Sequence, residues 1–187
     1  MEALFDDEDG YVEKVMRFWN KIAVAYSKDM IDAGGEMIYM WDPVASGDMI
    51  SPAMYEEFVV PALSDLIKEL HEICPYIGIH ICGDSSTRPR YIAQMGIDSF
   101  SVGNIDLVKA SADADGKVVM MGNLNPANTL IQKSADEIYE ISLELCKSMA
   151  DSGGFILSPG CDLSLLIPLE NLQAMAKAVE DYNSGLA

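Results

Sequence analysis

Short apolar segments alternate with amphipathic segments along most of the chain. From Tyr11 to Ala33, apolar residues recur every three or four positions, a spacing that places them on one face of an α-helix. Gly34 and Gly35 favour the end of that helix, because glycine adopts the left-handed conformation common after helix C-termini. The next segment, residues 36–41 (EMIYMW), is too short and too apolar for a surface helix and predicts a buried strand.

The same alternation continues towards the C-terminus. Four more short apolar segments predict strands at residues 76–80, 98–102, 118–121 and 155–157. Amphipathic segments predict helices at residues 52–73, 88–95, 106–113, 134–152 and 168–182. Ser51 is suited to cap the first of these helices, and Pro61 is expected to kink or split it. Ser134 and Glu137 form a capping-box pattern at the start of the fourth.

Regular alternation of strands and helices predicts an α/β fold with a parallel sheet. The first strand is not followed by a G-x-G-x-x-G loop, so a TIM-type (β/α) barrel is favoured over a doubly wound sheet. A complete barrel has eight strands and about 250 residues, whereas these 187 residues contain five predicted strands. We therefore expect a single domain over residues 1–187, an incomplete barrel made of about the last five βα units.

An incomplete barrel leaves sheet edges open to further pairing. Three arrangements would close them. The chain is a truncated part of a longer protein, or a split gene supplies the missing N-terminal half, or a partner chain covers the edges, as in a homo-oligomer.

The strongly acidic composition restricts the partners of the chain. With 30 acidic and 12 basic residues the net charge is −18, so nucleic acid and anionic membrane surfaces are not expected to bind. No apolar run approaches the ~20 residues of a membrane span. The N-terminal MEALFDDEDG lacks the basic and apolar regions of a secretory signal. A cytoplasmic location is therefore expected, where four cysteines do not form a disulfide framework.

Candidate chemistry lies at the carboxyl ends of the predicted strands, where barrel enzymes place their sites. His80 and Cys82 are two positions apart, and in an extended segment their side chains point the same way. Cys161 follows another strand, in a Gly-Cys-Asp loop. One imidazole and two thiolates form a zinc-binding set with an open fourth position, as in catalytic zinc sites. The H-x-C pair alone is a weak indication of metal binding, and Cys161 strengthens it.

Other residues have competing interpretations. Asp42 and Asp162 either orient His80 through its second ring nitrogen or cap the turns after their strands. Arg88 and Arg90 suit a substrate carboxylate or sulfonate, although surface arginines at a helix start are the more common explanation.

Three more polar residues are candidates because they follow strands. Asp42, Ser46 and Asn123 are expected to line the barrel mouth and bind substrate. The remaining cysteines, Cys74 and Cys146, fall at a helix end and inside a helix, and we expect them to be small core residues.

Several motifs resemble those of one enzyme family. They are HICGD at 80–84, MGNLNP at 121–126, GGFILSPGCD at 153–162, ASGDMISP at 45–52 and PLENL at 168–172. From about Tyr11 to its end, the chain resembles the C-terminal part of the uroporphyrinogen decarboxylase superfamily, and within it the corrinoid:coenzyme M methyltransferases. The resemblance implies a (β/α)8 barrel, of which the N-terminal units are missing here.

The resemblance also implies a reaction. In the methyltransferase branch a His-x-Cys…Cys set binds zinc, and zinc activates the coenzyme M thiol to accept a methyl group from a methylated corrinoid protein. Carried over, this implies Zn²⁺ on His80, Cys82 and Cys161, a corrinoid on a partner protein as methyl donor, and a small thiol as acceptor. The decarboxylase branch uses no metal, and its catalytic aspartate lies in the part missing here.

One departure from the family pattern affects the fourth zinc ligand. Relatives often carry an acidic residue after the Ser-Val of the third strand, whereas Ser101 and Val102 precede Gly103 and Asn104. Water or a residue of the missing part would then complete the site. Two alternatives stay open: a porphyrinogen decarboxylase, which needs an Arg and Asp cluster at the mouth, and a non-catalytic half-barrel that associates through its edges.

Overall fold

The computed structural model describes residues 10–186 and contains one parallel sheet. Its strands follow the order of the chain: β1 (Ile38–Trp41), β2 (Ile77–Ile81), β3 (Ser99–Val102), β4 (Val119–Leu124) and β5 (Phe155–Pro159). Each strand pairs with the next one. This is the strand order of a (β/α) barrel. In a doubly wound sheet, successive strands are added first on one side and then on the other, so the strand order reverses partway. The predicted α/β fold with five parallel strands is confirmed.

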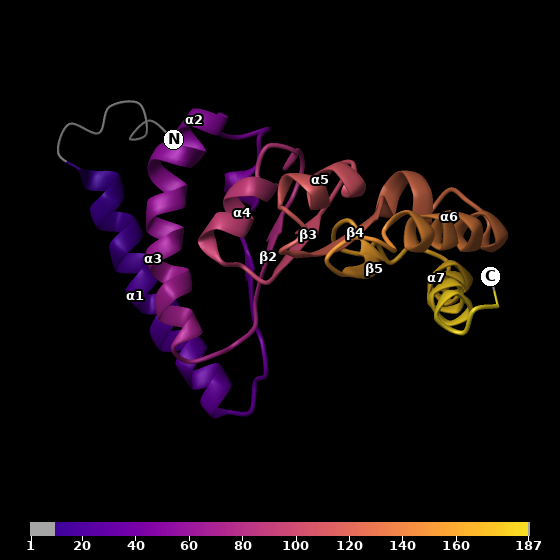
Figure 1. Ribbon diagram of the computed structural model, residues 1–187, viewed down its shortest axis with the longest axis horizontal. Helices are drawn as coiled ribbons and strands as arrows, with labels where there is room; N and C mark the ends of the chain where they lie inside the picture. The colour runs from indigo at the N-terminus through magenta and orange to yellow at the C-terminus, as the bar shows by residue number, and fades with distance from the viewer. Residues whose placement is uncertain (1–9, 187) are drawn as a thin grey trace.

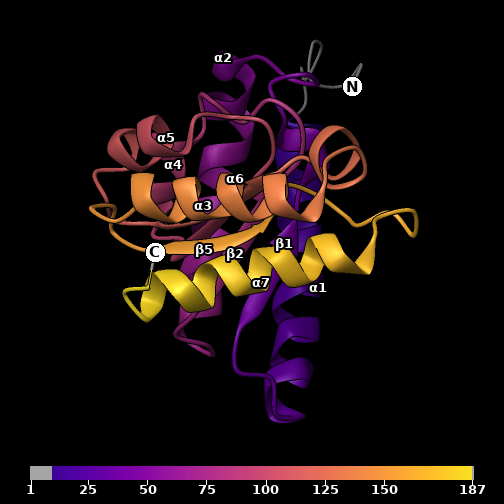
Figure 2. The same cartoon turned by 90° about the vertical axis from the view of Figure 1, so that its right-hand side faces the viewer.

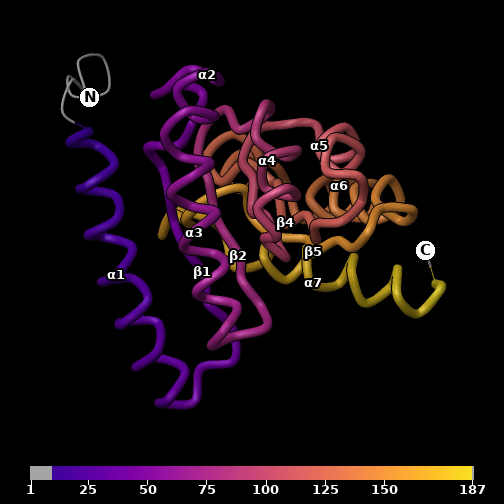
Figure 3. The backbone as a smooth tube through the Cα atoms, turned by 60° about the vertical axis from the view of Figure 1, so that its left-hand side comes forward, coloured from indigo at the N-terminus to yellow at the C-terminus, as the bar shows by residue number. Residues whose placement is uncertain are grey.

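Helices connect the strands and flank the sheet (Figure 1). They are α1 (Tyr11–Asp32), α2 (Pro52–Met54), α3 (Val60–His71), α4 (Pro89–Met95), α5 (Leu107–Asp113), α6 (Ala135–Ser148) and α7 (Leu169–Asn183). The long helices α1 and α3 pack side by side at one end of the molecule, as the tube in Figure 3 shows. At the other end α6 and α7 pack together beside β5 (Figure 2).

The predicted helix at residues 52–73 is split, as its proline suggested. A π-helical turn, Tyr55–Val59, separates α2 from α3, and Pro61 is the second residue of α3. Because Pro61 has no N–H to continue the α-helical hydrogen bonds, it fits only near the start of a new helix. The expected cap is also present, since the Ser51 hydroxyl accepts a hydrogen bond from the Met54 N–H. The reciprocal capping box at the start of α6 is confirmed as well.

The two faces of the sheet differ in character. Towards the helices, side chains such as those of Ile79, Phe100 and Met120 are fully buried in the main core. The opposite face corresponds to the barrel interior, and here His80 and Ser101 occupy paired positions of neighbouring strands. Alternate residues of a strand point to opposite faces, so the polar residues of this sheet converge on one side.

Two strands extend further than the apolar pattern indicated. Asn123 was expected to follow the fourth strand, but it lies inside β4, paired with Ser158 of β5. Glycine and asparagine are poor strand formers, and the backbone pairing of the two strands outweighs this preference. Asn123 therefore lies near the carboxyl end of a paired strand and not in a free loop.

None of the helices in residues 10–186 is both long and apolar enough to cross a membrane. Residues 1–9, in which no secretory signal was expected, lie outside the described residues. The cytoplasmic location stays a prediction.

Candidate metal centre

Three soft ligand atoms converge at the carboxyl end of the sheet. His80 is in β2, Cys82 follows that strand, and Cys161 follows β5. One ligand atom from each lies within 4.8 Å of the others. His80 Nε2 is 2.9 Å from the Cys82 sulfur, which in turn is 3.7 Å from the Cys161 sulfur. The structure therefore brings together all three residues that the sequence predicted as ligands.

The sulfur–sulfur distance suits a tetrahedral zinc ion. Two thiolates about 2.3 Å from zinc lie about 3.8 Å apart, and an imidazole nitrogen lies about 3.5 Å from each sulfur. The 3.7 Å between Cys82 and Cys161 already matches this geometry. The 2.9 Å between His80 and Cys82 would widen by about 0.6 Å when an ion is bound. The donor set thus fits zinc with a small local adjustment.

Curvature of the sheet brings Cys161 back to β2. In a flat sheet, the three strand spacings between β2 and β5 would separate their ends by roughly 14 Å. The turn after β5 also folds over the strand ends, where the Gly160 N–H donates to the Leu124 carbonyl. A Cβ on Gly160 would lie 3.1 Å from the Gly103 Cα. The absent side chain therefore permits the close backbone approach that positions Cys161.

His80 is buried and held through its other ring nitrogen. Nδ1 lies 3.0 Å from the hydroxyl oxygen of Ser101, on the neighbouring strand. Burial lowers the pKa of His80, and a backbone hydrogen bond with Ser101 and the charge of Asp162 partly oppose this shift. The Trp41 ring stands edge-on to the imidazole, with 6.4 Å between ring centroids. The imidazole is therefore favoured in its neutral, metal-binding form.

Cys82 is a thiol at neutral pH in the metal-free protein. Burial raises its pKa to about 11, aided by the hydrogen bond with Cys161 and by electrostatic repulsion between the Cys82 thiolate and its neighbours Cys161 and Asp162. A bound cation would displace this proton, because the thiolate is the form that binds metal.

The carboxylates expected beside His80 have other positions. Asp42 accepts a hydrogen bond from the Ala45 N–H and caps a short 3₁₀ turn, so its capping interpretation is confirmed. Asp162 borders the centre without a hydrogen bond to His80 among the described contacts. Ser101 makes the contact that was expected from an aspartate. The sequence signal for it was its spacing, since Ser99 and Ser101 occupy alternate positions of one strand.

The other two predicted mouth residues stabilise loops. Ser46 is buried, and its hydroxyl lies 3.3 Å from a carboxylate oxygen of Asp48. Asn123 donates from its side-chain amide to the carbonyls of Gly103 and Ile105, both at 2.7 Å. These contacts shape the loops around the metal centre, and substrate contact by Asp42, Ser46 and Asn123 stays a prediction.

Arg88 is not a surface arginine. Its side chain is fully buried and donates to the carbonyls of Ala45 and Ile50 at 3.0 and 2.9 Å. The guanidinium also lies over the Tyr55 ring, 4.3 Å from its centroid. The expectation of a surface residue is wrong for Arg88, because the loop after β1 wraps around the guanidinium and uses its donors.

Cys74 and Cys146 are buried, as expected.

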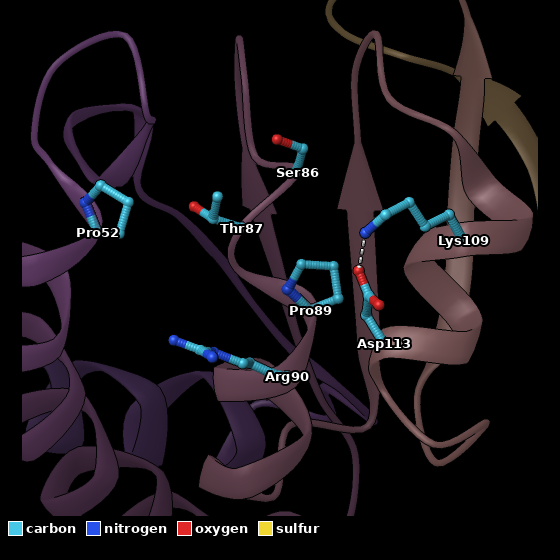
Figure 4. A pocket seen from close by; sticks show the side chains of 7 residues that line it. All are labelled: Pro52, Ser86, Thr87, Pro89, Arg90, Lys109 and Asp113. Atoms are coloured by element: carbon cyan, nitrogen blue, oxygen red, sulfur yellow. Dashed lines mark hydrogen bonds and ion pairs between the residues drawn. The ribbon is translucent and has the colours of Figure 1, made fainter.

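Arg90 lines a separate cavity on the helical side of the sheet (Figure 4). This cavity, of about 340 Å³, lies between the loop before α4 and the helix α5, and Lys109 pairs there with Asp113. It shares no lining residue with the metal centre.

A smaller cavity opens beside the ligands. It has a volume of about 140 Å³ and is lined by Tyr39, Trp41, His80, Ser101, Pro159, Cys161 and Asp162. Drug-sized ligands occupy roughly 300–1,000 Å³, so this space suits a small molecule. Sequence reasoning missed Tyr39 and Trp41, which are apolar in the β1 pattern but face the same side of the sheet as His80.

Comparison with known proteins relates this arrangement to one family. The family model described as uroporphyrinogen decarboxylase matches residues 2–182. A methylcobamide:CoM methyltransferase from Methanosarcina acetivorans is 28% identical over 96% of this chain and 51% of its own length. A methylated-thiol–coenzyme M methyltransferase from Methanosarcina mazei is 34% identical over 84% of this chain and 41% of its own length.

A solved structure has the same fold. It is a methyltransferase from Methanosarcina mazei, 25% identical in sequence, with a TM-score of 0.78 over 88% of this chain and 47% of its own chain. The chain thus spans about half the length of the curated relatives it matches.

Proposed function

The chain belongs to the uroporphyrinogen decarboxylase family, and within that family we propose that it provides the zinc centre of a methyltransferase. The methyl donor would be a methylated corrinoid on a partner protein, and the acceptor a small thiol such as coenzyme M. The printed names of the methyltransferase relatives support this reaction class. The convergence of His80, Cys82 and Cys161 within 4.8 Å carries the proposal.

His80, Cys82 and Cys161 would hold the ion and leave its fourth position towards the adjoining cavity. When bound, zinc would supply the Lewis acidity that turns a thiol into a thiolate nucleophile at neutral pH. Asp162 is the carboxylate in the cavity lining, so it is the candidate acceptor for the proton that the substrate thiol releases. Tyr39 and Trp41 would limit water at the reacting sulfur.

The remaining barrel units would complete the mouth. β1 and β5 are the outer strands of the described sheet, and side chains at this opening such as Trp41 and Ile156 are 65% and 47% exposed. A longer protein, a separate N-terminal half or a second copy of the chain would cover them. The corrinoid protein would dock at the mouth so formed.

Decarboxylation of a porphyrinogen is the second candidate function. A polycarboxylate substrate needs several arginines at the mouth, but no arginine or lysine is among the residues lining the cavity at the metal centre. Arg88 is buried and Arg90 lies on the helical side. A non-catalytic half-barrel is the third, and it predicts self-association through the open edges, measurable by size-exclusion chromatography.

Zinc content tests the proposal. Elemental analysis of the purified chain should give about one zinc per chain, lost in His80→Ala and in Cys161→Ala. Cys146→Ala is the matched control, because Cys146 is a buried cysteine of α6 outside the cluster, and it should retain the zinc. A folded wild-type chain without zinc would remove the support for methyl transfer and leave the family and fold.

A further inference from the structure

We propose that the Ser101 hydroxyl positions the imidazole of His80 for metal binding, and that Tyr39, crossing over Gly78, holds this hydroxyl in the required direction. The inference rests on the proposed zinc function and assigns the residues that prepare its histidine ligand. It concerns contacts within the chain that exist before any ion is bound.

The Ser101 hydroxyl contacts the imidazole of His80. A metal-binding histidine usually donates its second ring N–H to a fixed acceptor, which sets the tautomer and the ring orientation. Here Nδ1 lies 3.0 Å from Ser101 Oγ, while Nε2 faces the sulfur of Cys82. The two residues are also paired in register between β2 and β3, and both are buried. A proton on Nδ1 leaves the Nε2 lone pair free for the ion.

The proton of the Ser101 hydroxyl needs an acceptor of its own. If Ser101 Oγ accepts from His80, its own O–H must find another acceptor, because a buried hydroxyl without a partner is unfavourable. Tyr39 lines the same cavity as Ser101 and makes a side-chain hydrogen bond with it. Because Ser101 Oγ accepts from the His80 N–H in this proposal, its own O–H is left to donate to the Tyr39 oxygen. The proposed direction of the chain is thus His80 to Ser101 to Tyr39.

Tyr39 reaches towards β3 from β1 by crossing Gly78 of β2. In the sheet Tyr39 pairs with Gly78 of β2, and Gly78 pairs with Ser99 of β3. A Cβ on Gly78 would lie 2.6 Å from Tyr39 Cδ2 and 2.5 Å from Ser99 Oγ. The missing side chain of Gly78 therefore leaves the space through which the tyrosine ring lies across β2. Three strands contribute to a single arrangement on the interior face of the sheet.

A hydroxyl in this role differs from a carboxylate in charge. Zinc with two thiolates and a neutral imidazole is uncharged, and Ser101 orients the ring without adding a negative charge beside it. Such a centre would accept an anionic thiolate as its fourth ligand more readily than one with an extra carboxylate.

Zinc affinity of the full chain, measured by competition with a chelator, tests the role of Ser101. Removal of a group that orients a metal ligand typically weakens metal binding about 10–100-fold. For Ser101→Ala we expect zinc affinity to fall about tenfold, near the lower end of this range, because the Ser101 backbone also bonds to the imidazole. Ser101→Thr keeps the hydroxyl and should bind zinc within about threefold of the wild type.

Ser99→Ala is the matched control. Ser99 is on the same strand and the same face, is buried like Ser101, and its hydroxyl has no hydrogen-bond partner among the described residues. It should leave zinc affinity unchanged. Equal affinities for Ser101→Ala and Ser99→Ala would overturn the role of Ser101.

Tyr39→Phe tests the outer member of the chain. It keeps the ring over Gly78 and removes only the phenolic oxygen, so zinc affinity should fall about two- to tenfold, the effect of one hydrogen bond. The visible absorption spectrum of the cobalt(II)-substituted chain provides a second measurement. The visible ligand-field bands should shift in Ser101→Ala and in Tyr39→Phe and stay at the wild-type position in Ser99→Ala. A wild-type affinity and spectrum in Tyr39→Phe would remove Tyr39 from the proposal.

These results separate the two proposals. A wild-type chain that binds neither zinc nor cobalt overturns the zinc function itself. A wild-type chain that binds zinc, with Ser101→Ala equally tight, overturns only the positioning role.

Discussion

The sulfur atoms of Cys82 and Cys161 lie 3.7 Å apart although 79 residues separate them in the chain. A disulfide needs a sulfur–sulfur bond of about 2.05 Å, so a small movement would join them. In the metal-free chain we expect oxidised glutathione to form this bond, releasing two reduced glutathione molecules. Intact mass and peptide mapping should show a Cys82–Cys161 link, and zinc loaded beforehand should prevent it.

Cys74 and Cys146 are the internal comparison in that experiment. Both are buried, so they should remain reduced under the same conditions. A mixture of links that includes Cys74 or Cys146 would contradict the geometry of the centre.

Arg88 should be important for stability because its buried guanidinium satisfies the Ala45 and Ile50 carbonyls. Replacing it with methionine leaves these acceptors without their donors, at a cost of about 2–4 kcal/mol in the free energy of unfolding. Urea denaturation would measure this change. Arg90→Met is the comparison, since Arg90 is exposed and contacts the Tyr91 ring and hydroxyl; its loss should cost about 0.5–1 kcal/mol, clearly less than the loss of Arg88.

Gly160 should be required for the position of Cys161. A Cβ at Gly160 would meet the Gly103 Cα at 3.1 Å, so Gly160→Ala should push the turn away from the strand ends. We expect a loss of about 1–3 kcal/mol in stability from this crowding, together with weaker zinc binding. Gly103→Ala is the control, because its nearest contact would be an ordinary 3.4 Å. Equal zinc affinity in the two variants would contradict this role.

The start of α6 should make stability depend on pH in acid. Hydrogen bonds from Ser134, and then Lys133, lower the pKa of Glu137 to about 2. A carboxylate with a lowered pKa in the folded state stabilises the fold above its unfolded pKa, near 4.5, and this stabilisation is lost as pH falls towards 2. Glu137→Gln should therefore reduce the melting temperature at pH 7 and have little effect near pH 2.

Glu140→Gln is the control for this prediction. Glu140 is exposed on the same helix and lies outside the capping box, so its replacement should not produce the same dependence on pH. Melting curves followed by circular dichroism between pH 2 and pH 7 would distinguish the two variants.

The elements of the fold were predictable because hydrophobic spacing reports local geometry. The apolar spacing from Tyr11 to Ala33 matched α1, and the caps at Ser51 and Ser134 followed from their own short motifs. The ends of β4 and β5 were not predictable from this spacing, since Gly122 and Asn123 have weak strand preference. Their extended pairing depends on a neighbouring strand that is distant in the sequence.

The sequence by itself determined the order of strands and helices, the acidic surface charge and the three zinc-ligand candidates, because spacing and residue chemistry are local properties. Only the tertiary structure decided that the Ser101 side chain, and not that of Asp42, contacts the His80 imidazole, and that Arg88 is buried. These contacts join residues of different strands and loops. They depend on strand register, sheet curvature and the close approach allowed by Gly78 and Gly160, which no single segment encodes.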